Sequence, residues 1–294
     1  MQLRAGGRTL DLSGRPWLMG IVNATPDSFS DAGRYPTRES RFERARELLA
    51  DGADIIDIGG ESGITRGAVV GEQEEIERVG ELISRVAGEL GALVSVDTYK
   101  PAVAAAAIAA GAAIVNDVSG LREPALAEVC AAGGAALVVM HTRAKPKQRL
   151  QDPDLYDGDV LGDVQAFLEQ RIQLAVARGM ARSALIVDPG PDFAKTPAQT
   201  VELLRDVGRL HALGRPLLLA LSRKDFVGAV TVRAPRERTA GTLAAIAHGL
   251  DAGAQIFRVH DVAAAVDFIA VREVLRRERE VPRELALPDG LRWE

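Results

Sequence analysis

The 294-residue chain has a single cysteine, Cys130, so it forms no internal disulfide and offers no cysteine-based metal site. Aromatic residues make up only 4% of the sequence, and only five of its 36 basic residues are lysines. The first residues lack a basic segment followed by an apolar core, so we expect no signal peptide. The longest apolar runs, such as residues 217–221, are too short to span a bilayer. These absences favour a cytoplasmic, enzyme-sized protein with no membrane partner.

Several binding classes are also disfavoured. A formal net charge of −5 argues against general nucleic-acid binding, which favours a basic surface. No Gly-Lys pair occurs, which excludes a P-loop, and no G-x-G-x-x-G follows the first predicted strand. No H-E-x-x-H occurs either, and His141 and His260 end separate strands, so a zinc site is poorly supported.

The composition, 47% hydrophobic and 26% charged, is that of an ordinary globular protein. Residues 2–12 alternate apolar and polar side chains around Gly6 and Gly7, which predicts a small hairpin. After it, short apolar strands alternate with helices. The predicted strands are 17–22, 54–58, 92–96, 113–115, 136–140, 184–187, 216–221 and 255–257. The predicted helices are 38–51, 72–89, 101–110, 124–132, 160–178, 197–213, 236–252 and 261–277.

This strict alternation indicates an α/β protein with a parallel sheet and right-handed crossovers. Eight strand–helix units are the number that closes a (β/α)8 TIM barrel. A doubly wound open sheet is the alternative. We expect one domain over residues 1–294, with the hairpin in residues 1–16 and a loosely held tail over 278–294.

Every predicted strand ends in polar residues capable of chemistry. In order they are Asn23, Asp57 with Glu61, Asp97, Asn116, His141, Asp188, Lys224, and Arg258 with His260. One polar strand end is commonly a cap. In a barrel, however, all carboxyl ends of the strands line one mouth, where barrel enzymes have their active sites. The set therefore predicts a catalytic mouth.

The residue types indicate what the mouth binds. Asp97, Asn116 and Asp188 supply acceptors, and the amide also donates. This combination suits a heterocycle with an amino-pyrimidinone edge, whose N–H groups need carboxylate acceptors.

The other strand ends suit an anion. Arg66, Arg258 and His260 supply positive charge and planar donors for phosphate or carboxylate. Asn23 offers a neutral oxygen to a Mg²⁺ that holds a diphosphate, because Mg²⁺ takes few protein ligands and keeps water and phosphate oxygens. Mg²⁺ is therefore the expected cofactor.

Eight motifs at these strand ends carry a family resemblance. They are M-G-I-V-N-A-T-P-D-S-F-S-D at 19–31, D-I-G-G-E-S at 57–62, S-V-D-T-Y-K-P at 95–101, I-V-N-D-V-S-G at 114–120, V-M-H at 139–141, D-P-G-P-D-F-A-K at 188–195, S-R-K at 222–224, and R-V-H-D-V at 258–262. In this order, over residues 17 to 275, the chain resembles the dihydropteroate synthases, a pterin-binding family with a (β/α)8 fold.

The resemblance implies an activity in folate biosynthesis. Enzymes of this kind condense 6-hydroxymethyl-7,8-dihydropterin diphosphate with p-aminobenzoate, releasing diphosphate with the help of Mg²⁺. The bond from the pterin methylene carbon to diphosphate breaks first, and the aromatic amine then captures the cation. The resemblance also implies a homodimer, small-molecule substrates and a role as a target of sulfonamides.

Roles for individual residues follow from the resemblance. The pterin contacts Asp97, Asn116, Met140, Asp188, Lys224 and Arg258. The diphosphate meets Asn23, Arg66, Arg258 and His260, with Mg²⁺ on Asn23. The p-aminobenzoate pocket is bordered by Thr65, Phe193 and Ser222. The residues that carry the reaction are Asp97, Lys224, Arg258 and His260.

Four departures from the family pattern fall mainly on the p-aminobenzoate side. The usual E-S-T-R-P-G loop here contains two extra residues, Gly63 and Ile64. Asp192, Ala194 and Ala220 stand where glycines are usual. A paralogue that binds a pterin without synthase activity is therefore an alternative.

A pterin-dependent methyltransferase domain is the weaker alternative. The T-P-D-S-F-S-D loop that follows Asn23, together with R-V-H at 258–260, argues against it, because a methyl carrier has no diphosphate to bind.

Overall fold

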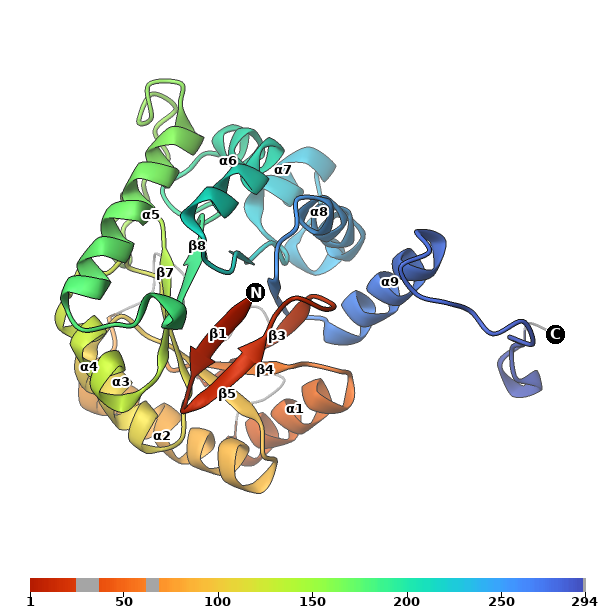
Figure 1. Ribbon diagram of the computed structural model, residues 1–294, viewed down its shortest axis with the longest axis horizontal. Coiled ribbons are helices and arrows are strands. Elements are labelled where there is room, and N and C mark those ends of the chain that lie inside the picture. The colour runs from red at the N-terminus through yellow and green to blue at the C-terminus, as the bar shows by residue number, and fades with distance from the viewer. Residues whose placement is uncertain (25–36, 62–68, 293–294) are drawn as a thin grey trace.

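The computed structural model describes residues 1–24, 37–61 and 69–292. The predicted hairpin is confirmed: β1 (Gln2–Ala5) pairs antiparallel with β2 (Arg8–Asp11). Gly6 and Gly7 form its turn with φ of 56° and 74°, a left-handed conformation that glycine adopts without steric cost. In Figure 1 this hairpin lies across the centre of the molecule.

The parallel sheet forms the predicted barrel. Its strands are β3 (Trp17–Asn23), β4 (Ile55–Gly59), β5 (Leu93–Asp97), β6 (Ile114–Asp117), β7 (Ala136–Met140), β8 (Leu185–Asp188), β9 (Leu218–Leu219) and β10 (Ile256–Val259). They pair in the order β8-β7-β6-β5-β4-β3-β10-β9. A parallel bridge between Val187 and Leu217 joins β8 to the chain entering β9, and the Val187 N–H donates to the Pro216 carbonyl at 2.9 Å. The sheet therefore closes.

Helices surround the barrel, as Figure 1 shows. They are α1 (Arg38–Ala50), α2 (Glu72–Glu89), α3 (Pro101–Ala109), α4 (Ala125–Gly133), α5 (Val160–Ala177), α6 (Pro197–Arg205), α7 (Asp225–Thr231), α8 (Thr239–Asp251) and α9 (Val262–Leu275). Short 3-10 helices are η1 (Arg182–Ala184), η2 (Val207–Leu213), η3 (Pro235–Glu237) and η4 (Asp289–Leu291). None of the helices in the described ranges is long and apolar enough to cross a membrane.

Two apolar clusters form the core. The larger one lies between the strands and the helices, and includes Val79 and Ile83 of α2. The smaller one fills the barrel's interior at the amino ends of the strands, where Leu3 and Ala5 of the hairpin pack beside Met19. The hairpin thus closes the end of the barrel opposite the strands' carboxyl ends.

The structure corrects three predicted elements in the last third of the chain. The predicted strand 216–221 is only the two-residue β9, and the predicted helix 197–213 divides into α6 and η2. Helix α7 was not predicted, and the helix predicted over 236–252 begins only at Thr239. Arg223 has φ of 58° and lies in a turn between β9 and α7. A seven-residue helix is too short to show a clear apolar period.

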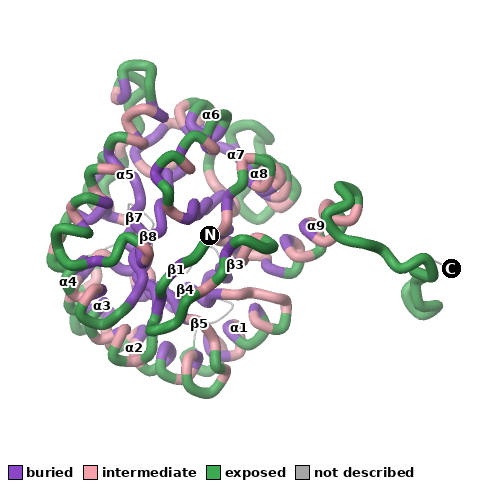
Figure 2. The backbone as a smooth tube through the Cα atoms, in the orientation of Figure 1, coloured by how far each residue is buried: buried purple, intermediate pink, exposed green. Residues whose placement is uncertain are grey.

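The last residues differ from the rest. Residues 275–292 are exposed throughout, and in Figure 2 this segment runs away from the barrel beyond α9. Five large apolar side chains are exposed on it: Leu275, Val281, Leu285, Leu287 and Leu291.

Close packing of α8 on the barrel gives a stability prediction. A methyl group at Gly249 would meet ring carbon Cε1 of Phe257 at 2.7 Å and Cδ1 of Leu219 at 2.8 Å. Gly249→Ala should lower the free energy of unfolding by about 1–3 kcal/mol, the usual cost of overpacking. Urea unfolding measures the change.

Gly80→Ala in α2 is the matched control, because a methyl group there meets no atom within 4 Å. It should leave stability unchanged or raise it by about 0.5–1 kcal/mol, the helix preference of Ala over Gly. Equal effects of the two substitutions would contradict the packing argument.

Candidate active site

A cavity of about 640 Å³ lies at the carboxyl ends of the barrel strands. Ten predicted site residues line it: Asn23, Asp97, Asn116, Met140, Asp188, Phe193, Ser222, Lys224, Arg258 and His260. The structure therefore brings together every predicted binding residue that it describes. Thr65, Arg66, the Gly63-Ile64 insertion and the loop 27–36 lie outside the described residues.

The two-residue period of a strand explains this convergence. Side chains that point into the barrel alternate with side chains that point toward the helices. On β3 the inward positions are Met19, Ile21 and Asn23, and on β7 they are Ala136, Val138 and Met140. Each of these inward rows thus begins in the smaller apolar cluster, at the amino ends of the strands, and ends at the cavity.

A guanidinium holds the acidic side of the cavity together. Arg258 on β10 donates from Nε to Asp57 Oδ2 at 2.7 Å and from Nη2 to Asp97 Oδ2 at 2.9 Å. Asn116 donates to the same Asp57 oxygen at 3.3 Å. Burial opposes the charge of Arg258, but Asp57 and Asp97 outweigh it and raise the pKa of Arg258. These side chains are therefore oriented by ion pairing before any ligand contacts them.

Two predicted rim residues do not line the cavity. Asp57 is fully buried in the layer beneath it, because Gly59 takes the last inward position of β4. His141 is also fully buried and points the other way, because Met140 takes the last inward position of β7. Asp57 contacts the cavity residues Arg258 and Asn116, and His141 contacts Lys195 of the loop after β8.

His141 belongs to a buried chain of polar groups. Its Nε2 lies 2.9 Å from Asp163 Oδ1, and its Nδ1 lies 2.8 Å from Lys195 Nζ. Despite partial burial, hydrogen bonds from His141 and Arg143 lower the pKa of Asp163 to about 2. Ionised Asp163 accepts the Nε2 proton, so Nδ1 is left to accept from Lys195. Burial, with Lys195 beside it, lowers the pKa of His141 to about 3, so the ring is neutral.

Lys195 fastens the loop after β8, and sequence reasoning did not assign it a role. Besides His141, its Nζ donates to the carbonyls of Gly190 at 2.9 Å and Phe193 at 3.1 Å. All three hydrogens of an ammonium group thus have acceptors, although burial lowers the pKa of Lys195 to about 7. Only the D-P-G-P-D-F-A-K motif signalled this residue.

Glu61 is paired rather than available for catalysis. Lys100 Nζ lies 2.6 Å from Glu61 Oε2 and 2.5 Å from Glu75 Oε2, and donates to the Val70 carbonyl at 2.7 Å. Lys147, from the long segment between β7 and α5, lies 3.1 Å from Glu61 Oε1. This cluster connects the end of β4 to that segment across the cavity.

Ser222, which follows β9, and His260, which follows β10, form a side-chain hydrogen bond. His260 Nδ1 lies 2.9 Å from Ser222 Oγ. Burial, helped by Arg223 and Arg258, lowers the pKa of His260 to about 3. His260 is therefore neutral near pH 7 and offers an N–H donor rather than the positive charge expected from the sequence.

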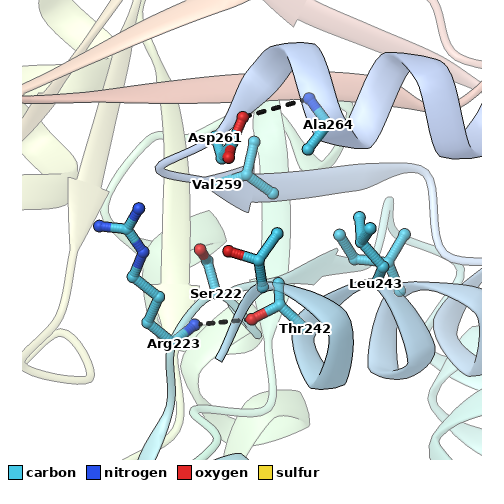
Figure 3. Close-up of a pocket in the computed structure, with 9 residues that line it drawn as sticks. Ser222, Arg223, Thr242, Leu243, Val259, Asp261 and Ala264 are labelled. Carbon is cyan, nitrogen blue, oxygen red and sulfur yellow. Dashed lines mark hydrogen bonds between the residues drawn. The ribbon is translucent and has the colours of Figure 1, made fainter. Parts of the chain in front are cut away.

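Figure 3 shows how the turn that carries Ser222 is held. The Arg223 N–H donates to Thr242 Oγ1 of α8 at 3.0 Å, and Asp261 caps α9 by accepting from the Ala264 N–H at 3.1 Å. A small pocket lies between these residues, with Val259 and Leu243 on its wall. The turn after β9 is thus anchored to α8.

Burial dominates the electrostatics of the remaining cavity groups. It raises the pKa of Asp97 to about 7, against the opposing effect of Arg258, and also raises the pKa of Asp188. It lowers the pKa of Lys224. These groups gain from a ligand whose N–H donors and carbonyl oxygen replace the hydration they have lost.

Comparisons with known proteins agree on one family. Residues 19–260 match the family described as pterin binding enzyme. Dihydropteroate synthase from Bacillus subtilis is 42% identical over 246 residues, which cover 83% of each chain. A Xanthomonas albilineans dihydropteroate synthase structure with 4-aminobenzoic acid aligns with a TM-score of 0.85 at 41% identity, covering 96% of this chain and 99% of that one. A Yersinia pestis dihydropteroate synthase with a sulfonamide drug complex aligns with a TM-score of 0.87 at 39% identity, covering 95% and 100%.

The raised pKa of Asp97 predicts a pH-dependent stability cost. The folded state retains the Asp97 proton up to about pH 7, whereas an unfolded aspartic acid releases it near 3.8. Wild-type stability therefore falls across this interval as pH rises. Asp97→Asn cannot titrate, so its stability relative to wild type should improve from pH 4 to pH 8 by roughly 4 kcal/mol, since the shift is about three pKa units and each unit corresponds to about 1.4 kcal/mol. Urea unfolding at both pH values tests this, and a pH-independent difference would contradict it.

Proposed function

The chain belongs to the pterin-binding enzyme family, among its dihydropteroate synthases, and we propose that this cavity condenses 6-hydroxymethyl-7,8-dihydropterin diphosphate with p-aminobenzoate. The observation that carries the proposal is the convergence of ten predicted binding side chains on one 640 Å³ cavity. The products are 7,8-dihydropteroate and diphosphate.

The strand ends β5, β6 and β8 form the pterin side in this proposal. Asp97, Asn116 and Asp188 present acceptors to the amino and ring N–H groups, and Lys224 donates to the ring carbonyl. Hydrogen bonds to ionised carboxylates favour that ionised form, so a bound pterin offsets the burial that raises the pKa of Asp97 and Asp188. Met140 lines the cavity and packs on the ring.

Arg258 and His260 serve the leaving diphosphate. When the carbon–oxygen bond breaks, its electron pair leaves with diphosphate, so donors and positive charge at that oxygen stabilise the transition state. Arg258 supplies the charge, and neutral His260 supplies an N–H. Arg66 completes this set in the proposal. Asp97 and Asp188 stabilise the cation that remains on the pterin methylene.

Asn23 at the end of β3 is the proposed Mg²⁺ ligand. The described residues contain no group of three or more His, Cys, Asp or Glu able to hold a metal. One amide oxygen at the cavity wall fits Mg²⁺, which binds through few protein atoms together with water and phosphate oxygens. The bound ion would supply Lewis-acid stabilisation of the departing diphosphate.

The acceptor amine enters beside Phe193 and Ser222, with Thr65 completing the border in this proposal. The amine lone pair forms the carbon–nitrogen bond, and the nitrogen then loses a proton. This nucleophile needs no strong base, and the paired state of Glu61 agrees with that. Binding of 4-aminobenzoic acid and of a sulfonamide drug by two structural neighbours supports the same acceptor pocket here.

We also propose that the protein is a cytoplasmic homodimer. Apolar side chains exposed on α9, Val271 at 60% and Leu275 at 78%, lie on the helix that follows α8 and β10 in the chain. The alanine-rich residues 239–254 provide the proposed contact surface.

The activity itself is the first test. The purified protein with Mg²⁺, pterin diphosphate and p-aminobenzoate should form dihydropteroate and release diphosphate in equal amounts, as chromatography measures. Lys224→Ala should reduce pterin affinity at least about a hundredfold, because it leaves the buried ring carbonyl of the pterin without its hydrogen-bond donor.

Arg233→Ala is the matched control, since it removes a cation beyond the end of α7 and outside the cavity lining. Tight pterin binding without any dihydropteroate would instead support a binding paralogue.

The metal proposal predicts a change in Mg²⁺ dependence. EDTA should abolish turnover, and Asn23→Ala should raise the Mg²⁺ concentration for half-maximal rate about tenfold, since even outer-shell partners of a metal are worth about 10–100-fold. Asn23→Asp keeps an oxygen ligand and should retain the wild-type dependence. Pterin binding without Mg²⁺ serves as the control, and an unchanged Mg²⁺ curve for Asn23→Ala would exclude this ligand.

A further inference from the structure

Two residues of the loop after β8 adopt a conformation that side chains rarely take. Asp192 has φ of 66° and Ala194 has φ of 54°, and both stand where the family resemblance predicts glycine. The loop therefore carries side chains at two left-handed backbone positions that glycine adopts without steric cost. For Ala194 the structure shows no compensating side-chain bond, but for Asp192 it shows several.

The Asp192 side chain joins two helices that follow different strands. Thr200 of α6 donates its hydroxyl to Asp192 Oδ1 at 3.0 Å and accepts the Asp192 N–H at 3.0 Å. On the other side, the N–H groups of Asp225 and Phe226 donate to Asp192 Oδ2 at 2.6 and 3.3 Å. These are the first two amides of α7.

This contact replaces the cap that α7 lacks. Lys224 occupies the N-cap position of α7 and makes no side-chain capping bond, so the first amides of the helix depend on another acceptor. Asp192 supplies it from 33 residues away in the sequence. Its carboxylate also suits the positive end of the helix.

The two segments that Asp192 joins both border the cavity. Phe193 follows Asp192 directly, and Lys224 directly precedes α7. Lys224 Nζ lies 4.3 Å from the centre of the Phe193 ring. The contact between Asp192 and the first turn of α7 therefore holds Phe193 near the turn at 222–224, and Asp192 itself lies at the cavity wall.

We propose that Asp192 is a positioning residue for the aromatic amine: it holds the loop after β8 against the first turn of α7 and so fixes the gap between Phe193 and Ser222. This inference rests on the proposed function for the identity of the substrate. Lys195 fastens the same loop from the barrel side, and Asp192 fastens it from the helix side. Loss of the Asp192 side chain removes the contact between this loop and α7, while the Lys195 hydrogen bonds to the loop remain.

Asp192→Gly is the decisive variant, because glycine adopts φ of 66° without strain and the fold is kept. The KM for p-aminobenzoate should rise about tenfold, since misplacing a positioning group by about 1 Å costs up to about a hundredfold. The KM for pterin diphosphate should rise by no more than about threefold, because most pterin side chains lie at strand ends away from this contact. Lys224 is the exception, since it directly precedes α7 and interacts with the charge of Asp192.

Two further variants separate positioning from general stability. Asparagine tolerates the left-handed conformation and keeps an oxygen that can accept from the α7 amides. Asp192→Asn should therefore retain the wild-type KM for p-aminobenzoate. Val232→Gly is the matched control: Val232 has φ of 55° at the other end of α7 and is 89% exposed. It should leave both KM values unchanged.

Hydrogen exchange gives a readout that is independent of activity. In Asp192→Gly, the amides of Asp225 and Phe226 should exchange faster than in wild type, while amides of β5 and β6 keep their protection. Unchanged exchange at these amides, or equal increases in both KM values, would overturn the inference. If the wild-type chain makes no dihydropteroate, the proposed function fails separately. The exchange result and the calorimetric affinity for p-aminobenzoate in wild type and Asp192→Gly then decide the inference.

Discussion

The cavity depends on one largely buried guanidinium, Arg258, and on the two carboxylates that neutralise it. A charge inside a barrel is costly unless it is paired, and Asp57 and Asp97 lie 2.7 and 2.9 Å from it. Asp57 touches no cavity surface, yet it also accepts from Asn116. Removing it would deprive Arg258 of an ion-pair partner and Asn116 of this acceptor. The orientation of the proposed pterin and diphosphate groups thus rests on a residue below them.

The two ends of the barrel interior have opposite characters, and this polarity explains how a charged cavity is compatible with a stable fold. At the amino ends of the strands, the hairpin residues Leu3 and Ala5 complete an apolar plug. At the carboxyl ends, the same inward rows finish in carboxylates, amides and cations. Burial of the plug supplies stability, while burial at the cavity shifts pKa values, as for Asp97 and Lys224.

The two proposed substrates meet different kinds of structure. The pterin side is built from strand ends, which the sheet holds rigidly. The acceptor side is built from loops, and these need separate fastenings: Lys195 inside the loop after β8, Asp192 outside it, and Thr242 on the turn after β9. The departures from the family pattern at Asp192 and Ala194 fall on this side. Both residues have left-handed φ angles, which glycine adopts without steric cost.

The sequence by itself determined the barrel, the hairpin and the strand-end residues that converge on the cavity, because strand periodicity and strand ends are local properties of the chain. The family resemblance in the sequence added Met140, Phe193 and Ser222. It could not place His141 or Asp57, since the neighbours Met140 and Gly59 take the last inward positions. It also missed α7 and the roles of Lys195 and Asp192. Those features arise from contacts between segments that follow different strands, such as Asp192 with the Asp225 and Phe226 amides. Only the closed barrel brings such segments together, so only the tertiary structure decided them.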